Sequence, residues 1–96
     1  MTALTSAGDF RPRIRALIYV VQFHEDPAAS VDHALEQTVR RKALGAGAQE
    51  YLDAVRAALA SDEQLSTLIP QDHPEDKVRA FLREVERRLA AELAPS

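Results

Sequence analysis

The stretch Pro74–Leu93, PEDKVRAFLREVERRLAAEL, decides the fold of this 96-residue chain. Its large apolar side chains recur every three or four residues, at Val78, Phe81, Leu82, Val85, Leu89 and Leu93. That spacing is typical of an α-helix that buries one stripe against a core. Pro74 suits the start of such a helix, because the N–H that proline lacks would have no partner there. The stretch therefore predicts a long amphipathic helix.

Working back along the chain, the same spacing predicts four more helical segments. They cover about residues 9–24, 26–43, 48–60 and 61–69. Pro27 is expected to separate the first two, because a residue that precedes proline disfavours helical geometry. Gly45 and Gly47 are expected to end the second segment. Ser61 and Gln64 have the spacing of a capping box, which would start the fourth.

The predicted fold is all-α, as a compact bundle or orthogonal array of four to five helices. Connections of about two to six residues favour antiparallel neighbours, and both arrangements satisfy that condition. Residues 1–8 are expected to form a flexible N-terminal tail, with Asp9 as the cap of the first helix. Residues 9–94 are expected to form a single helical domain, because a chain of this length has room for one core.

Composition favours helices and a reducing environment. Alanine occurs 17 times and glycine three times, a balance that suits helices packed through small side chains. The absence of cysteine excludes disulfides and thiolate chemistry and fits a reducing cytosol. Residues 1–8 lack the pattern of a signal peptide, and the apolar run Ala16–Val21 is too short to span a bilayer. A cytoplasmic location without membrane contact is therefore expected.

The five aromatic side chains are thinly spread along the chain. We expect them to anchor the core rather than to form a stacking platform. They are Phe10, Tyr19, Phe23, Tyr51 and Phe81.

Charge is distributed unevenly within a net charge of −3. The segment Ser61–Asp76 contains no lysine or arginine and five acids, which are Asp62, Glu63, Asp72, Glu75 and Asp76. Such a surface would repel nucleic acid and anionic membranes, and it would suit a basic partner. Acids at the starts of helices also complement the helix dipole, which accounts for Asp62, Glu63 and Glu75 without a partner. Both interpretations stay open.

No pattern of catalytic or metal-binding residues is recognisable. His24, Glu25 and Asp26 lie near His33 and Glu36 in the sequence, but they match neither the zinc-protease spacing nor the repeated Glu-x-x-His of di-iron proteins. The serines lie in no nucleophile or phosphate-loop motif. We therefore expect no enzyme, no metal and no cofactor, and a domain that works by binding another protein.

Two other functions compete with this expectation. Arg11, Arg13 and Arg15, together with Arg40–Lys42, could form a basic patch for nucleic acid, although the overall balance of charge disfavours it. A helical module for self-assembly or scaffolding is the third hypothesis. The sequence leaves the oligomeric state open.

An aromatic-His-Glu-Asp motif ends the first predicted helix and precedes a serine-containing loop and an Ala-Leu pair. Leucine-rich helices, an acidic serine turn, a proline loop and an aromatic-Leu pair follow. In these features the chain resembles the small immunity proteins of contact-dependent growth inhibition systems, over about residues 13–91. The matching segments are Phe23–Asp26, Ala29–Asp32, Ala34-Leu35, Tyr51–Leu59, Ser61–Glu63, Leu65–Ile69, Pro70–Pro74 and Phe81–Leu89.

The resemblance implies a cytosolic inhibitor that binds and blocks a cognate toxin domain, often a nuclease. A nuclease has a basic substrate surface, which an acidic protein can cover by electrostatic complementarity. The predicted contact residues are the acids Asp62, Glu63, Asp72, Glu75 and Asp76. A second candidate contact consists of His24, Glu25 and Asp26.

Overall fold

Helices make up the regular secondary structure of residues 10–42 and 47–94, the parts of the chain that the computed structural model describes. The α-helices are α2 (Arg11–Val21), α3 (Val31–Gln37), α4 (Ala48–Ala60) and α5 (Glu75–Leu93). Two short 3₁₀ helices, η1 (Pro27–Ser30) and η3 (Leu65–Thr67), lie between them. No strand occurs within the described ranges. The predicted all-α class and the number of helices are confirmed.

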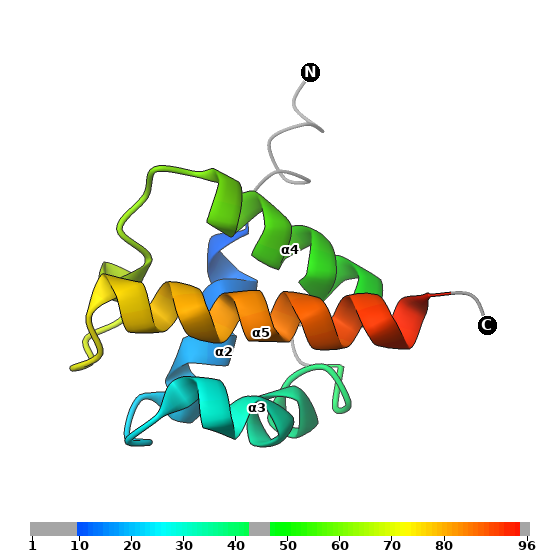
Figure 1. The fold of residues 1–96 in the computed structure, drawn as a ribbon, viewed down its shortest axis with the longest axis horizontal. Helices are drawn as coiled ribbons and strands as arrows, with labels where there is room; N and C mark the ends of the chain where they lie inside the picture. The colour runs from blue at the N-terminus through cyan, green and yellow to red at the C-terminus, as the bar shows by residue number, and fades with distance from the viewer. Residues whose placement is uncertain (1–9, 43–46, 95–96) are drawn as a thin grey trace.

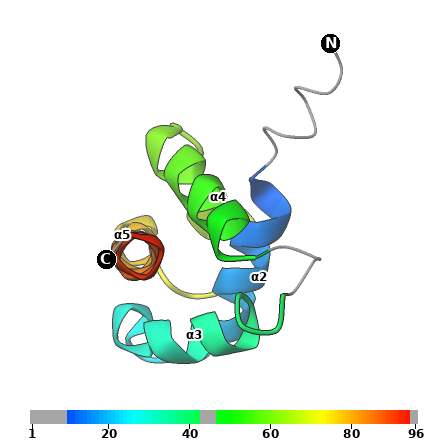
Figure 2. The ribbon, with the colours of Figure 1, turned by 90° about the vertical axis from the view of Figure 1, so that its right-hand side faces the viewer.

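Three of the helices form a layer, and the fourth crosses behind it. α5 lies between α4 and α3, and α2 passes behind them (Figure 1). The view along α5 shows the same arrangement, with α2 packed against both α3 and α4 (Figure 2). The described chain extends over 38 × 33 × 21 Å. The arrangement fits the predicted compact bundle of four to five helices, with α2 crossing behind the other three (Figure 1).

The core is the set of apolar stripes that the spacing predicted. Tyr51 and Phe81 are the largest fully buried side chains. Around them lie Ile14, Leu17, Ile18, Val21, Val31, Leu35, Leu52, Val55, Leu65, Val78, Leu82, Val85 and Leu89. Leu93 was also expected in the stripe, but it is 41% exposed because the last turn of α5 extends beyond the neighbouring helices (Figure 1).

The second predicted helix is shorter than expected, since α3 ends at Gln37. The hydroxyl of Thr38 donates to the Ala34 carbonyl at 2.7 Å. The N–H of Arg40 then donates to the Leu35 carbonyl at 2.9 Å, five residues back, which replaces the α-helical pairing. The basic residues 40–42 therefore follow the helix instead of forming its last turn.

Glycine starts a helix where it was expected to end one. Gly47 is the N-cap residue of α4, and its N–H donates to the Glu50 carboxylate at 3.0 Å. Gly45 and Asp9, for which caps were predicted, lie outside the described residues. The third predicted helix has the expected bounds, Ala48–Ala60.

The fourth predicted helix is reduced to the single turn η3. The Ser61 hydroxyl donates to the Ala58 carbonyl at 2.7 Å and accepts from the Glu63 N–H at 3.3 Å, so the predicted capping box with Gln64 is wrong. The N–H groups of Leu65 and Ser66 donate instead to the carboxylate of Glu75, which lies on α5. Side-chain partners thus replace the helical hydrogen bonds of this segment.

Replacing Phe81 with alanine should lower the free energy of unfolding by about 3–5 kcal/mol, because a fully buried ring leaves a cavity. Urea denaturation monitored by circular dichroism measures the change. Arg83→Ala is the matched control on the same helix, since Arg83 is exposed, and it should change stability by roughly 0.5 kcal/mol or less. Equal effects of the two substitutions would contradict the described core.

Candidate binding surfaces

The acidic segment 61–76 forms one end of the molecule, between α4 and the start of α5 (Figure 1). Two of its five acids have partners within the domain. Glu63 accepts two hydrogen bonds from the Arg11 guanidinium, at 2.8 Å from Nε and 2.7 Å from one terminal nitrogen. This two-point pairing joins the segment to the start of α2, and it engages Glu63 internally.

Glu75 is the second acid with internal partners. Its carboxylate accepts from the N–H of Leu65 at 3.0 Å, from the N–H of Ser66 at 2.8 Å and from Arg79 Nε at 2.7 Å. Leu65 and Ser66 open the η3 turn, so a side chain of α5 supplies the cap that this short helix lacks.

Arg79 completes the connection from the other side. Its terminal nitrogens donate to three backbone carbonyls, those of Leu59 at 3.1 Å, Ser61 at 3.0 Å and Glu63 at 2.9 Å. These carbonyls belong to the end of α4 and the chain that follows it, where no helical N–H is available. We call Glu75 and Arg79 with their backbone partners the α5 clamp.

Opposing effects act on the pKa of Glu75. Burial raises it, but the Ser66 and Leu65 N–H groups and Arg79 stabilise the ionised form more strongly. The net result is a pKa below the ordinary glutamate value of 4.5. The clamp therefore contains an ionised carboxylate at neutral pH.

The remaining acids of the segment are Asp62, Asp72 and Asp76, and all three are exposed. None of their side chains makes a hydrogen bond or ion pair with any residue in the described ranges. The five predicted contact acids thus divide into two that hold the fold and three that face solvent. The segment contains no basic residue of its own, but Arg11 and Arg79 from neighbouring helices neutralise part of its charge.

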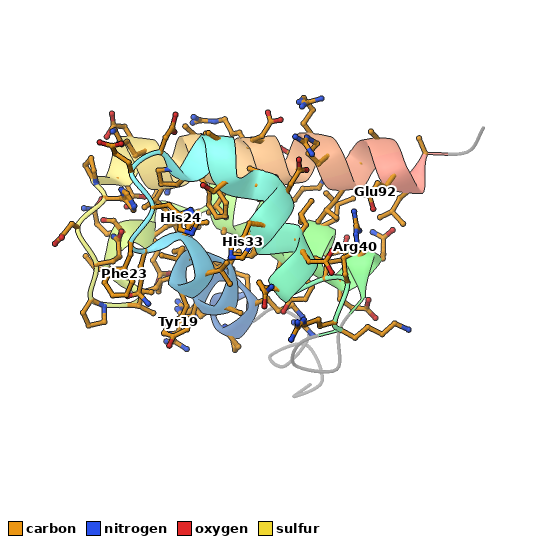
Figure 3. All side chains as sticks on the ribbon, turned by 90° about the horizontal axis from the view of Figure 1, so that it is seen from below. Tyr19, Phe23, His24, His33, Arg40 and Glu92 are labelled. Atoms are coloured by element: carbon orange, nitrogen blue, oxygen red, sulfur yellow. The ribbon has the colours of Figure 1, made fainter. Side chains whose placement is uncertain are left out.

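The two basic clusters also have internal partners. Arg11 pairs with Glu63, and Arg15 Nε donates to the Leu68 carbonyl at 3.3 Å. Arg40 pairs with Glu92 of α5 through two contacts of 2.8 and 2.5 Å (Figure 3). This pairing raises the pKa of Arg40 and lowers the pKa of Glu92. Two of the six predicted phosphate contacts, Arg11 and Arg40, are therefore paired with carboxylates of the domain.

The second candidate contact lies where α2 passes to α3. The rings of His24 and His33 stack with centroids 5.4 Å apart and planes at 29° (Figure 3). His24 Nδ1 lies 2.8 Å from the Ser30 hydroxyl, while Glu25 and Asp26 are exposed. Within the described residues, no three His, Asp or Glu side chains gather into a possible metal site.

Two aromatic side chains contradict the expectation that all five anchor the core. Tyr19 is 66% exposed and Phe23 is 92% exposed. Tyr51 and Phe81 are buried, and Phe10 packs at the edge of the core. Tyr19 lies outside the buried stripe of α2, and Phe23 follows the end of that helix. The helical spacing could therefore have identified both side chains as exposed.

An open groove of about 850 Å³ lies beside these aromatic side chains. Its lining comes from α2 and the two residues after it, from α3 and Thr38, and from the chain after η3, and it includes Arg15, Tyr19, Val20, Phe23, His33 and Ile69. No Asp or Glu is among its lining residues. We call this surface the aromatic groove. It is a mainly apolar surface on a chain whose net charge is negative.

Comparison with protein-family models, curated proteins and solved structures found no match to this chain. The resemblance to immunity proteins therefore stays a prediction. None of the helices in the described ranges combines the length and apolar character that crossing a bilayer requires.

Replacing Glu75 with glutamine should lower stability at neutral pH by roughly 1–3 kcal/mol, because the clamp loses charge-assisted hydrogen bonds. The folded-state pKa of Glu75 is lowered, so its stabilisation is complete above the ordinary value of 4.5 and is lost as pH falls through the lowered pKa. The Glu75→Gln protein should consequently lose less stability on acidification than the original protein.

Urea midpoints measured from neutral pH down to acid pH test this expectation. Asp62→Asn is the matched control, because Asp62 is an exposed acid of the same segment without a described partner. Its acid dependence should match that of the unsubstituted chain. A Glu75→Gln curve parallel to both would show that the clamp does not require the ionised carboxylate.

Proposed function

We propose that this protein binds and neutralises a cognate toxin domain. The observation that carries the proposal is the set of exposed acids, Asp62, Asp72 and Asp76, which keep their charges free of internal partners at one end of the molecule. Three exposed carboxylates without internal partners suit the basic substrate-binding surface of a nuclease. The sequence resemblance to immunity proteins supplies the toxin as the class of partner.

The proposal also fits the use that the domain makes of its polar side chains. Glu63, Glu75 and Arg79 connect helices and loops of the domain. A protein that inhibits by occupying a surface needs a rigid scaffold and exposed contact groups, and no reactive group. The acidic segment is held by such a scaffold.

A nucleic-acid-binding function receives less support. Arg11 and Arg40 form two-point pairs with carboxylates, and phosphate would have to displace those partners. The exposed acids at the neighbouring end would add repulsion.

Co-expression of the C-terminal domain encoded by the adjacent gene, with and without this protein, tests the biological proposal. We expect growth to be rescued when this protein is present. Unchanged toxicity would show that this protein does not neutralise that domain. Normal growth without this protein would show that the neighbouring domain is not a toxin.

With a toxin in hand, Asp72→Lys should slow association by about tenfold at low ionic strength, and the effect should shrink as salt is added. Asp72 lies outside the helices, so the substitution leaves helix dipoles unchanged. Asp53→Lys, the same charge reversal on an exposed position of α4, is the control and should leave the association rate nearly unchanged. Stopped-flow fluorescence measures both rates. Equal slowing by the two variants would indicate a general charge effect and would reject the acidic end as the contact surface.

A further inference from the structure

The aromatic groove exposes apolar surface that the fold does not use. Phe23 is the most exposed large apolar side chain in the described residues, and Tyr19 follows it. Both point away from the ribbon on the side where α2 meets α3 (Figure 3). Single exposed apolar residues are ordinary on protein surfaces, but two aromatic rings beside a groove of about 850 Å³ form a contiguous apolar surface.

Arg15 gives this surface its charge. Six of the ten arginines pair with carboxylates of the same chain, and these are Arg11, Arg40, Arg56, Arg79, Arg87 and Arg88. Arg15 has no carboxylate partner in the described ranges, and its one hydrogen bond uses Nε and the Leu68 carbonyl. Its two terminal nitrogens are left for a ligand at the wall of the groove.

We propose that the aromatic groove binds an amphipathic helix of a partner protein, with a carboxylate of that helix paired to Arg15. Apolar residues on one face of the helix would pack on Tyr19, Phe23 and Ile69, in the mode by which grooves between helices commonly recognise peptides. A carboxylate beside that face would form a two-point pair with the guanidinium. The lining contains no acid that would repel it.

The charge of the groove favours this occupant over a second copy of the chain. The exposed large apolar side chains of the described residues are Tyr19, Phe23 and Leu93, so a second copy would mainly offer the groove itself. A symmetric pairing of two grooves would bring Arg15 and His33 of both copies together without an opposing carboxylate. The groove is also open to solvent, whereas small-molecule sites usually enclose most of their ligand.

This inference does not depend on the proposed toxin. The groove adjoins the acidic segment at Ile69, but none of its lining residues is an acid and its charged contact is Arg15, so its partner would carry the opposite charge. A chain with both surfaces could hold two partners, or two regions of one partner.

Selection from a display library tests the groove. The library presents helical peptides on one scaffold with one face randomised, and binders are selected on the full chain. We expect enriched sequences to combine apolar residues at helical spacing with Asp or Glu beside them. Enrichment of basic sequences, or of none, would overturn the proposal.

The enriched peptide, fluorescently labelled, then measures affinity by anisotropy. Phe23→Ser and Arg15→Glu should each weaken binding by about tenfold or more. Arg83→Glu is the matched charge reversal on α5, at an exposed position without a described partner, and it should leave affinity unchanged. Thermal melts of the three variants establish that each is folded.

A charge exchange separates the proposed ion pair from a general loss of structure. The peptide with its acid replaced by arginine should bind the Arg15→Glu protein more tightly than the original peptide does. Failure of this exchange, or equal weakening by Phe23→Ser and Arg83→Glu, would overturn the proposal. Sedimentation that shows a dimer of the original chain and a monomer of Phe23→Ser would assign the groove to a second copy and overturn it as well.

Discussion

The α5 clamp is the interaction on which the irregular half of the molecule depends. Residues 61–74 contain one 3₁₀ turn and little other regular structure, so their backbone groups need partners outside a helix. Glu75 takes two of the N–H groups and Arg79 takes three carbonyls, all from one turn of α5. An ionised pair at this position is thus a structural device for ordering a loop. It ties the backbone on either side of Asp62 to α5, the helix that also carries Asp76.

The sequence predicted the parts of the fold that depend on local spacing. The apolar stripe of α5 and the bounds of α4 follow from residue periodicity alone, because a helix repeats its own geometry. The errors occurred where a distant or unusual partner decides the backbone. Thr38 and Arg40 end α3 early through hydrogen bonds that no propensity describes, and Glu75 acts on residues ten positions before it.

The candidate surfaces were predicted only in part. The errors again arose where a partner distant in the sequence, or a position beyond the end of a helix, decides the environment of a side chain. The acidic segment was visible as a run without lysine or arginine, but its neutralisation by Arg11 comes from 52 residues away. Asp62 and Glu63 are adjacent in sequence, yet one faces solvent and the other is held by α2. The aromatic groove was missed because Phe23 lies beyond the end of its helix, and residue type alone favours burial of phenylalanine.

The order of elements along the chain gives the clamp a consequence for biosynthesis. α5 follows α2, α3 and α4, and it packs on α4, η1 and η3. Translation adds residues much more slowly than a helix forms, so the earlier helices can appear on the ribosome while their apolar faces still lack a cover. The emerging chain exposes these faces until the apolar stripe of α5 can cover them. The backbone around Asp62 consequently reaches its final hydrogen bonding only after α5 has emerged.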